Sequence, residues 1–189
     1  MKKIGHAGTL DPLATGLLIV CTGKMTKQID QFQAQEKEYT GTFVLGKTTP
    51  SHDLETQIVE GGNPFELTAP QLTEASQKFI GIIQQIPPIH SAIKVDGKRA
   101  YALARKGKDP DLKPREVTVS AFDLVSINIP EVHFRIICSK GTYIRSLARD
   151  FGDELKVGSY LSSLRRTRIG EFKLENALTL EQIASKLSS

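Results

Sequence analysis

The predicted strands of this chain are separated by segments of very unequal length, and this irregular order restricts the folds open to it. Segment 38–46 alternates and is rich in Tyr, Thr, Phe and Val, which is typical of a strand. Further strands are predicted at 57–60, 116–129, 131–141 and 165–174, with a short helical turn and a buried strand within 12–23. Helices are predicted at 68–86, at 142–155 continued by 159–166, and at 179–185. This order favours an α+β domain with a mainly antiparallel sheet rather than a regular βαβ alternation.

Length and composition indicate one domain and exclude several classes of protein. A chain of 189 residues can bury its own core, and its longest apolar run, Leu17 to Cys21, is too short to cross a bilayer. Cys21 and Cys138 are isolated, which argues against a zinc site or a disulfide framework. No phosphate-binding loop, dinucleotide fingerprint, HExxH or GxSxG motif occurs. We therefore expect a cytoplasmic protein with no secretory signal, metal or membrane span.

The net charge of +4 is distributed unevenly along the chain. Segment 94–115 holds eight Lys or Arg residues against three acids, and segment 145–173 holds seven against four. Such clusters are typical of a surface that binds nucleic acid, but they also occur on an ordinary solvated face. Charge alone does not decide between these two interpretations.

The stretch GHAGTLDPLATG, residues 5–16, places one carboxylate, that of Asp11, among four turn-forming residues. Because Asp followed by Pro is common at helix starts, Asp11 could cap a helix that begins at Pro12. Glycines also let another backbone approach closely, which would leave Asp11 on the floor of a cleft as a nucleophile. His6 lies in the same loop.

Two further stretches combine basic side chains with apolar ones. In CSKGTYIRSLARD, Tyr143 and Arg145 follow an apolar strand, where they could offer a stacking ring and a guanidinium that binds a carboxylate at two points. Alternatively, Tyr143 packs in the core and Arg145 lies on a helix surface. The stretch LSSLRRTRIG brings three arginines together, as phosphate ligands or as guards of an exposed strand edge: Arg165, Arg166 and Arg168.

These stretches occur together, and in order, in one known family. The segments GHAGTLDPLATGLL, KEYTGTFVLG, IPPIHSAIKVDGKRAY, CSKGTYIRSLARDFG and YLSSLRRTRIGEF resemble the successive motifs of the TruB-type tRNA pseudouridine synthases. The resemblance runs from Gly5 to about Leu180, nearly the whole chain. It implies the pseudouridine synthase fold, a mainly antiparallel mixed sheet flanked by helices and loops with an RNA-binding insertion.

The resemblance also implies an activity, the isomerisation of the uridine at position 55 in the T-loop of tRNA to pseudouridine. In this reaction the bond from N1 breaks and the base is re-attached through C5, with no cofactor and no metal. A carboxylate can hold the detached base through a covalent or ion-paired intermediate. It could attack the ribose carbon or C6 of the uracil, and the sequence does not distinguish these routes. By resemblance, Asp11 is the catalytic aspartate, and Arg145 orients it and keeps it ionised.

The same resemblance assigns residues to the substrate pocket. Tyr39 matches the tyrosine that stacks on the flipped-out base, and Tyr143 and Leu164 match residues that line the pocket. His6 matches the histidine that fills the space the base leaves in the T-loop. Asp53 falls where the family carries an acid near the pocket.

We expect one catalytic domain over residues 1–189, with an insertion at 87–116 that closes over the T-stem loop. Within it, the sequence predicts a hairpin at 94–99 and a short basic helix at 100–107. Contacts with the tRNA partner, bound by a monomer, are expected at Lys94, Arg99, Arg105, Lys106, Arg165 and Arg166.

Two departures from the family pattern accompany this resemblance. Family members carry a DKPxGxTS-like segment ahead of the first motif, and bacterial members commonly carry a C-terminal PUA domain. We expect the chain of 189 residues to lack both, and therefore to bind tRNA weakly and turn over poorly. Two alternatives are a non-catalytic RNA-binding protein and, more remotely, a protein-interaction module that uses the basic face.

Overall fold

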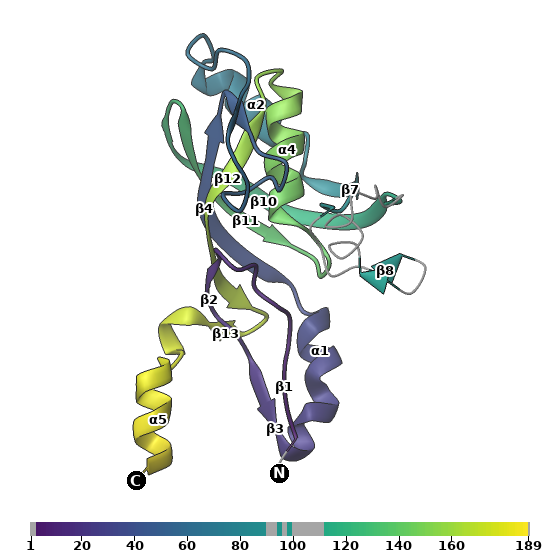
Figure 1. Cartoon of the computed structure of the whole chain (residues 1–189), viewed down its shortest axis with the longest axis vertical. Helices are drawn as coiled ribbons and strands as arrows, with labels where there is room; N and C mark the ends of the chain where they lie inside the picture. Colours follow the sequence, from purple (N-terminus) through teal and green to yellow (C-terminus); the bar gives the residue numbers. More distant parts are fainter. Residues whose placement is uncertain (1–2, 90–93, 96–97, 100–111, 189) are drawn as a thin grey trace.

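A computed structural model of the chain describes residues 3–89, 94–95, 98–99 and 112–188. Its long strands form one curved, seven-stranded sheet (Figure 1). Across the sheet the order is β13 (Phe172–Lys173), β12 (Ser159–Ile169), β4 (Lys37–Leu45), β11 (Glu131–Cys138), β10 (Arg115–Asn128) and β7 (Gly81–Gln85), with β2 (Thr15–Gly16) also paired to β12. All of these pairs are antiparallel except β2 with β12, which confirms the predicted α+β class and the mainly antiparallel sheet.

Smaller elements surround this sheet. The two-stranded pairs are β1 (Ile4–His6) with β3 (Val20–Thr22), β5 (Lys47–Thr48) with β6 (Val59–Glu60), and β8 (Lys94–Val95) with β9 (Lys98–Arg99). The helical elements are η1 (Gly23–Gln28), α1 (Ile29–Ala34), α2 (Ala69–Gln77), α4 (Ile144–Glu154), η2 (Leu174–Asn176) and α5 (Leu180–Ser188). Figure 1 shows β1, β3 and α1 extending from one end of the sheet. Within the described ranges, no helix has the length and apolar character needed to span a membrane.

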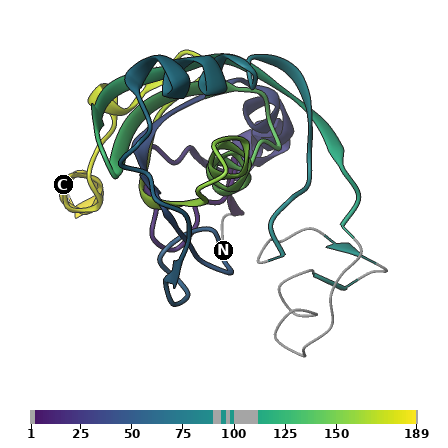
Figure 2. The same cartoon turned by 90° about the horizontal axis from the view of Figure 1, so that it is seen from above.

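The core lies between the curved sheet and helix α4, which sits inside the curve in Figure 2. Four phenylalanines meet there, with ring centroids as close as 4.2 Å between Phe43 and Phe134 and 5.5 Å between Phe122 and Phe151. Truncating a buried Phe of this kind typically costs about 3–5 kcal/mol. The core therefore holds α4 rigidly against β4, β10 and β11, and α4 carries Arg145.

Several predicted elements differ from the structure, and two of these differences have a clear physical reason. The helix expected over 68–86 ends at Gln77, because Gly81 has a φ of 102° and the following isoleucines pair with β10 as strand β7. The helix expected over 159–166 is the first part of β12, which pairs with β4 along its length. The apolar residues of segment 159–166 are spaced as in a helix, but its backbone hydrogen bonds to β4 make it a strand. No helical turn precedes the short strand β3.

Candidate active site

Asp11 lies in the loop between β1 and β2 and does not cap a helix. The amide of Ala14 donates to the carbonyl of Asp11 at 2.9 Å and closes a turn, and no helix begins at Pro12. The capping interpretation is therefore wrong. The Asp11 carboxylate instead reaches across to helix α4.

The glycines of this loop allow the close backbone approach that the sequence suggests. Strand β2 runs parallel to β12, with Thr15 opposite Arg165 and Gly16 opposite Arg166. A Cβ built on Gly16 would lie 2.3 Å from the carbonyl oxygen of Arg166, and the φ of Gly16 is 106°. Only glycine fits there. The loop is thus pressed onto β12, and this contact sets where Asp11 stands.

Arg145 binds Asp11 with both arms of its guanidinium. Its Nε donates to Oδ2 and its Nη2 to Oδ1, both at 2.9 Å, while Nη1 donates to the carbonyl of Ser51 at 3.3 Å. The Arg145 side chain is 2% exposed, whereas that of Asp11 is 35% exposed. Arg145 is the second residue of α4, so the rigid first turn of that helix positions its guanidinium. The two-point contact fixes the plane of the carboxylate and leaves it open to solvent.

Asp53 supplies a second carboxylate to the same guanidinium, at 3.5 Å from Nε, and is only 6% exposed. Its own loop is tightly bonded. The hydroxyls of Thr49 and Ser51 donate to the Asp53 carbonyl at 2.6 and 3.1 Å, and the amide of Glu55 donates to Oδ1 at 3.0 Å. The backbone of Asp53 also forms an isolated parallel β-bridge with Leu161 of β12. Arg145 therefore joins two loops that are far apart in the chain.

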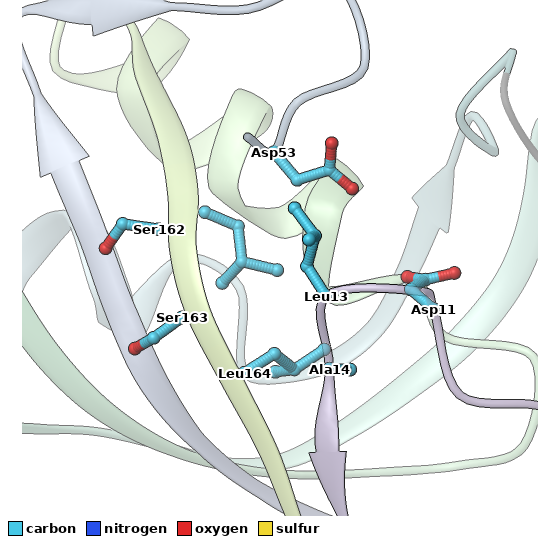
Figure 3. A pocket seen from close by; sticks show the side chains of 8 residues that line it. Asp11, Leu13, Ala14, Asp53, Ser162, Ser163 and Leu164 are labelled. Atoms are coloured by element: carbon cyan, nitrogen blue, oxygen red, sulfur yellow. The ribbon is translucent and has the colours of Figure 1, made fainter. Parts of the chain in front are cut away.

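A small pocket opens beside the two carboxylates (Figure 3). It is lined by Asp11, Leu13, Ala14, Asp53, Leu161, Ser162, Ser163 and Leu164. In Figure 3 the Leu164 side chain points toward Ala14, while the hydroxyls of Ser162 and Ser163 point away toward β4, where they donate to Thr42. Both carboxylates thus border a largely apolar recess. This arrangement suits a nucleophile or a base that acts on a flat, mostly uncharged group.

Tyr39 lies on β4, directly opposite Arg166 of β12. Burial raises the pKa of Tyr39, and the Asp11 carboxylate acts in the same direction while Arg166 opposes it. Tyr39 therefore stays protonated. Tyr143 immediately precedes α4 and is half-buried, and His6 is exposed on β1. Neither lines the pocket of Figure 3.

The residues predicted to contact RNA fall into three groups. Arg165 is exposed on β12, and within the described part of the chain it has no ion-pair partner. Arg166 is buried and bonded to backbone carbonyls, so its predicted role as a phosphate ligand is wrong. Lys94 and Arg99 lie in the predicted hairpin, but their side chains are outside the described structure, as are Arg105, Lys106 and the predicted helix at 100–107.

Two residues of the site were missed from the sequence. Gln85 is buried at the end of β7, where its side-chain amide donates to the Tyr143 carbonyl at 3.1 Å and accepts from the Tyr143 amide at 2.8 Å. It fixes the start of α4, and no sequence signal marks this role. His52 has a φ of 61°, and burial together with Arg149 and Arg145 lowers its pKa from 6.5 to about 4. Its position next to Asp53 in the sequence was the one signal that could have placed His52 near the site.

No group of three or more His, Cys, Asp or Glu residues in the described segments could hold a metal ion. The site consists instead of two carboxylates, one shared guanidinium and an apolar recess. The chemistry that these residues can support themselves is acid–base or nucleophilic.

Comparison with known proteins identifies relatives along the whole chain. Residues 1–144 match the TruB family pseudouridylate synthase N-terminal domain, and residues 145–188 match the tRNA pseudouridylate synthase B C-terminal domain. The chain is 54% identical over 179 residues to tRNA pseudouridine synthase B of Phocaeicola vulgatus, covering 95% of this chain and 76% of that protein. It is 55% identical over 177 residues to the protein of that name from Bacteroides fragilis, covering 93% and 76%.

A solved structure agrees with these relatives. The crystal structure of a Cbf5–Nop10–Gar1 complex contains a chain that superposes with a TM-score of 0.73 at 31% identity. The match covers 97% of this chain but only 45% of that one. The chain described here thus spans less than half of that solved protein.

Proposed function

The chain belongs to the TruB family of pseudouridylate synthases, and we propose that it converts the uridine at position 55, in the T-loop of tRNA, to pseudouridine with Asp11 as the nucleophile. Its relatives are tRNA pseudouridine synthases, so the enzyme is an isomerase that acts on a uridine of tRNA. The T-loop site and the aspartate nucleophile are the finer parts of the proposal. The aspartate nucleophile is supported by a half-open Asp11 carboxylate held at two points by the buried Arg145. The T-loop site rests on the membership of the chain in the TruB family.

The reaction requires a group that holds the uracil while it turns. Asp11 would bond either to C1′ of the ribose or to C6 of the base as the N1–C1′ bond breaks. The rotated base then bonds to C1′ through C5, the proton on C5 leaves, N1 takes up a proton, and the carboxylate is released. One proton is lost and one is gained, so the reaction needs no added reactant. Arg145 supports each step because its two-point contact holds the carboxylate correctly oriented.

Binding of the base is assigned to the apolar side chains around the recess. The target uridine must leave its stack to reach Asp11, and a flipped base is held by stacking and apolar contacts. Leu164 lines the recess, and Tyr39 lies on β4 opposite Arg166 of β12, the strand that also carries Leu164. We assign Tyr39 and Leu164 to the two faces of the flipped base and Tyr143 to the edge of the recess. His6 is assigned to the space that the flipped base leaves in the T-loop.

Binding of the RNA backbone is assigned to exposed cations. Arg165 fits this role because it is exposed beside the recess, while Arg135 and Arg168 are paired with Glu38 and Glu36 at 2.7 and 2.9 Å. We also assign phosphate contacts to Lys94, Arg99, Arg105 and Lys106 in segment 87–116, which we propose closes over the T-stem within a single catalytic domain. Changing Arg99, Arg105 and Lys106 together to Gln should weaken RNA binding and flatten its salt dependence.

The test is tritium release from a T-stem-loop RNA labelled at C5 of uracil, since only isomerisation frees that hydrogen. We expect release with the native chain, none from an RNA carrying cytidine at the target position, and none with Asp11→Asn. Release by Asp11→Asn would overturn the assignment of the nucleophile. Salt-sensitive binding without any release would favour a non-catalytic RNA-binding protein.

A further inference from the structure

Arg165 and Arg166 are neighbours in sequence but have opposite environments. Arg165 is exposed on β12, whereas Arg166 is 2% exposed and among the largest fully buried side chains. Arg166 donates from Nε to the carbonyl of Leu17 at 2.8 Å and from Nη2 to the carbonyl of Gly8 at 3.0 Å. Its guanidinium is therefore used within the protein and is not available to a ligand.

The two carbonyls that Arg166 binds are the two ends of the loop that carries Asp11. Gly8 precedes Asp11 and Leu17 follows it, and both ends are held by one planar group. The backbone of Arg166 adds a third contact, because its carbonyl accepts from the amide of Leu17 at 2.8 Å. The loop from Gly8 to Leu17 is thus closed by a single residue of β12.

An arginine at this position carries a cost that a neutral side chain would not. All of its hydrogen-bond partners given above are carbonyls, and among the described ion pairs none includes Arg166. Burying a cation without a carboxylate is unfavourable. Lysine offers a point charge that cannot span two carbonyls, whereas a guanidinium offers a rigid fork. The fork geometry is therefore what this position requires.

Arg166 also borders the rest of the site. Tyr39 is its cross-strand partner, and the Arg166 guanidinium opposes the rise in the pKa of Tyr39. A Cβ built on Gly8 would lie 3.6 Å from its Nη1, so the clamp fits closely against the loop. A shift of Arg166 would move the Asp11 loop and the Tyr39 hydroxyl together.

We propose that Arg166 is a positioning residue, whose guanidinium clamps both ends of the Asp11 loop and so holds the carboxylate in line with Arg145. The effect of Arg166 on catalysis rests on the proposed function, whereas its effect on the Asp11 loop does not. A misplacement of about 1 Å can cost about 10²-fold in rate, so loss of the clamp should lower kcat.

The kinetic test compares matched variants in the full chain with the T-stem-loop RNA. Arg166→Gln and Arg166→Lys should each lower kcat by about 10–100-fold with KM changed less than about threefold. Arg165→Gln, the matched control, should raise KM more than it lowers kcat and reduce the salt dependence of binding. The proposal is wrong if Arg166→Lys has the kcat of the native chain, or if the Arg166 variants change KM and the salt dependence of binding instead of kcat.

Amide hydrogen exchange tests the clamp without any activity. The amides of Ala14 and Leu17 should exchange at least about tenfold faster in Arg166→Lys than in the native chain, with α4 and β4 unchanged. Equal exchange would overturn the proposal, as would failure of both Arg166 variants to fold, since the residue would then serve the whole core. If the native chain releases no tritium, the proposed function is wrong, but the hydrogen-exchange rates of Ala14 and Leu17 still test whether Arg166 holds the Asp11 loop.

Discussion

Asp11 and Asp53 are two carboxylates that meet the same guanidinium, yet their surroundings differ in nearly every respect. Asp11 contacts Arg145 through both oxygens at 2.9 Å and remains 35% exposed. Asp53 lies 3.5 Å from Arg145 and is 6% exposed, with its loop held by Thr49, Ser51 and Glu55. Both loops rest on the same strand, β12, at Arg166 and at Leu161.

We interpret this difference as that between a reacting group and a supporting one. A nucleophile must be reachable by its substrate. Asp11 meets this condition through its exposure. Asp53 does not, because its side chain is buried and its loop is bonded around it. We therefore assign the chemistry to Asp11 and the support of Arg145 to Asp53, and the following predictions test that division.

The largest expected effect comes from Asp11→Asn. An amide of the same shape cannot act as the nucleophile, so kcat should fall by at least ~10⁴-fold. The dissociation constant for the T-stem loop should change less than about twofold, because binding depends on phosphate contacts. Tritium release and filter binding measure the two quantities. Activity within tenfold of the native chain would show that Asp53 can replace Asp11, and the comparison would fail.

Arg145→Lys should have the next largest effect, because it breaks the contact that the two carboxylates share. Lysine keeps the positive charge but not the planar two-point contact with Asp11, so kcat should fall by about 10²-fold. Arg145→Ala should lose more and should also lower the melting temperature, since it leaves Asp53 buried without its cation. Equal kcat for Lys and Arg would mean that charge alone matters there.

Asp53→Asn should have a smaller effect than either change. The amide oxygen can still accept from Glu55, but the attraction that anchors Arg145 is lost, so kcat should fall by about tenfold. An RNA with 5-fluorouridine at the target position should still form a long-lived adduct with this variant, but not with Asp11→Asn. Loss of the adduct in Asp53→Asn would make both carboxylates part of the chemistry.

Tyr39 tests whether the base is held by a ring or by a hydroxyl. Tyr39→Phe keeps the ring and should lower kcat/KM by less than about fivefold. Tyr39→Leu should lower it by about tenfold or more, since stacking of a base on an aromatic side chain is worth about 1–3 kcal/mol. The opposite ranking would assign the role to the hydroxyl, which lies near Arg166.

The smallest effect concerns His52, the neighbour of Asp53. Its native pKa of about 4 lies below the ordinary value of 6.5, so the unfolded chain binds the proton more readily. Its contribution to stability is therefore complete above pH 6.5 and is lost as the pH falls toward 4. Asn tolerates the φ of 61° and does not titrate, so His52→Asn should flatten melting temperature against pH in this window. An unchanged profile would contradict this prediction.

Local patterns in the sequence determined most of the secondary-structure elements. The alternation in segment 131–138 predicts β11, and the order of strands and helices predicts the α+β class. These patterns are readable because each reflects the geometry of a few neighbouring residues. The pairing of Asp11 with Arg145, which the structure shows, was instead implied by the family resemblance, because the residue types left open a helix cap for Asp11 and a helix surface for Arg145.

Only the tertiary structure decided which of two similar side chains does what. Arg165 and Arg166 are indistinguishable by type, but successive residues of β12 point to opposite faces of the sheet, and the approach of β2 places Arg166 against Gly8 and Leu17. Segment 159–166 became a strand, because pairing with β4 satisfies its backbone over most of its length. In the same way, Asp11 and Asp53 differ in exposure because β12 holds their loops at different points. Such contacts join residues more than 100 positions apart, and a pattern of neighbours in sequence carries no record of them.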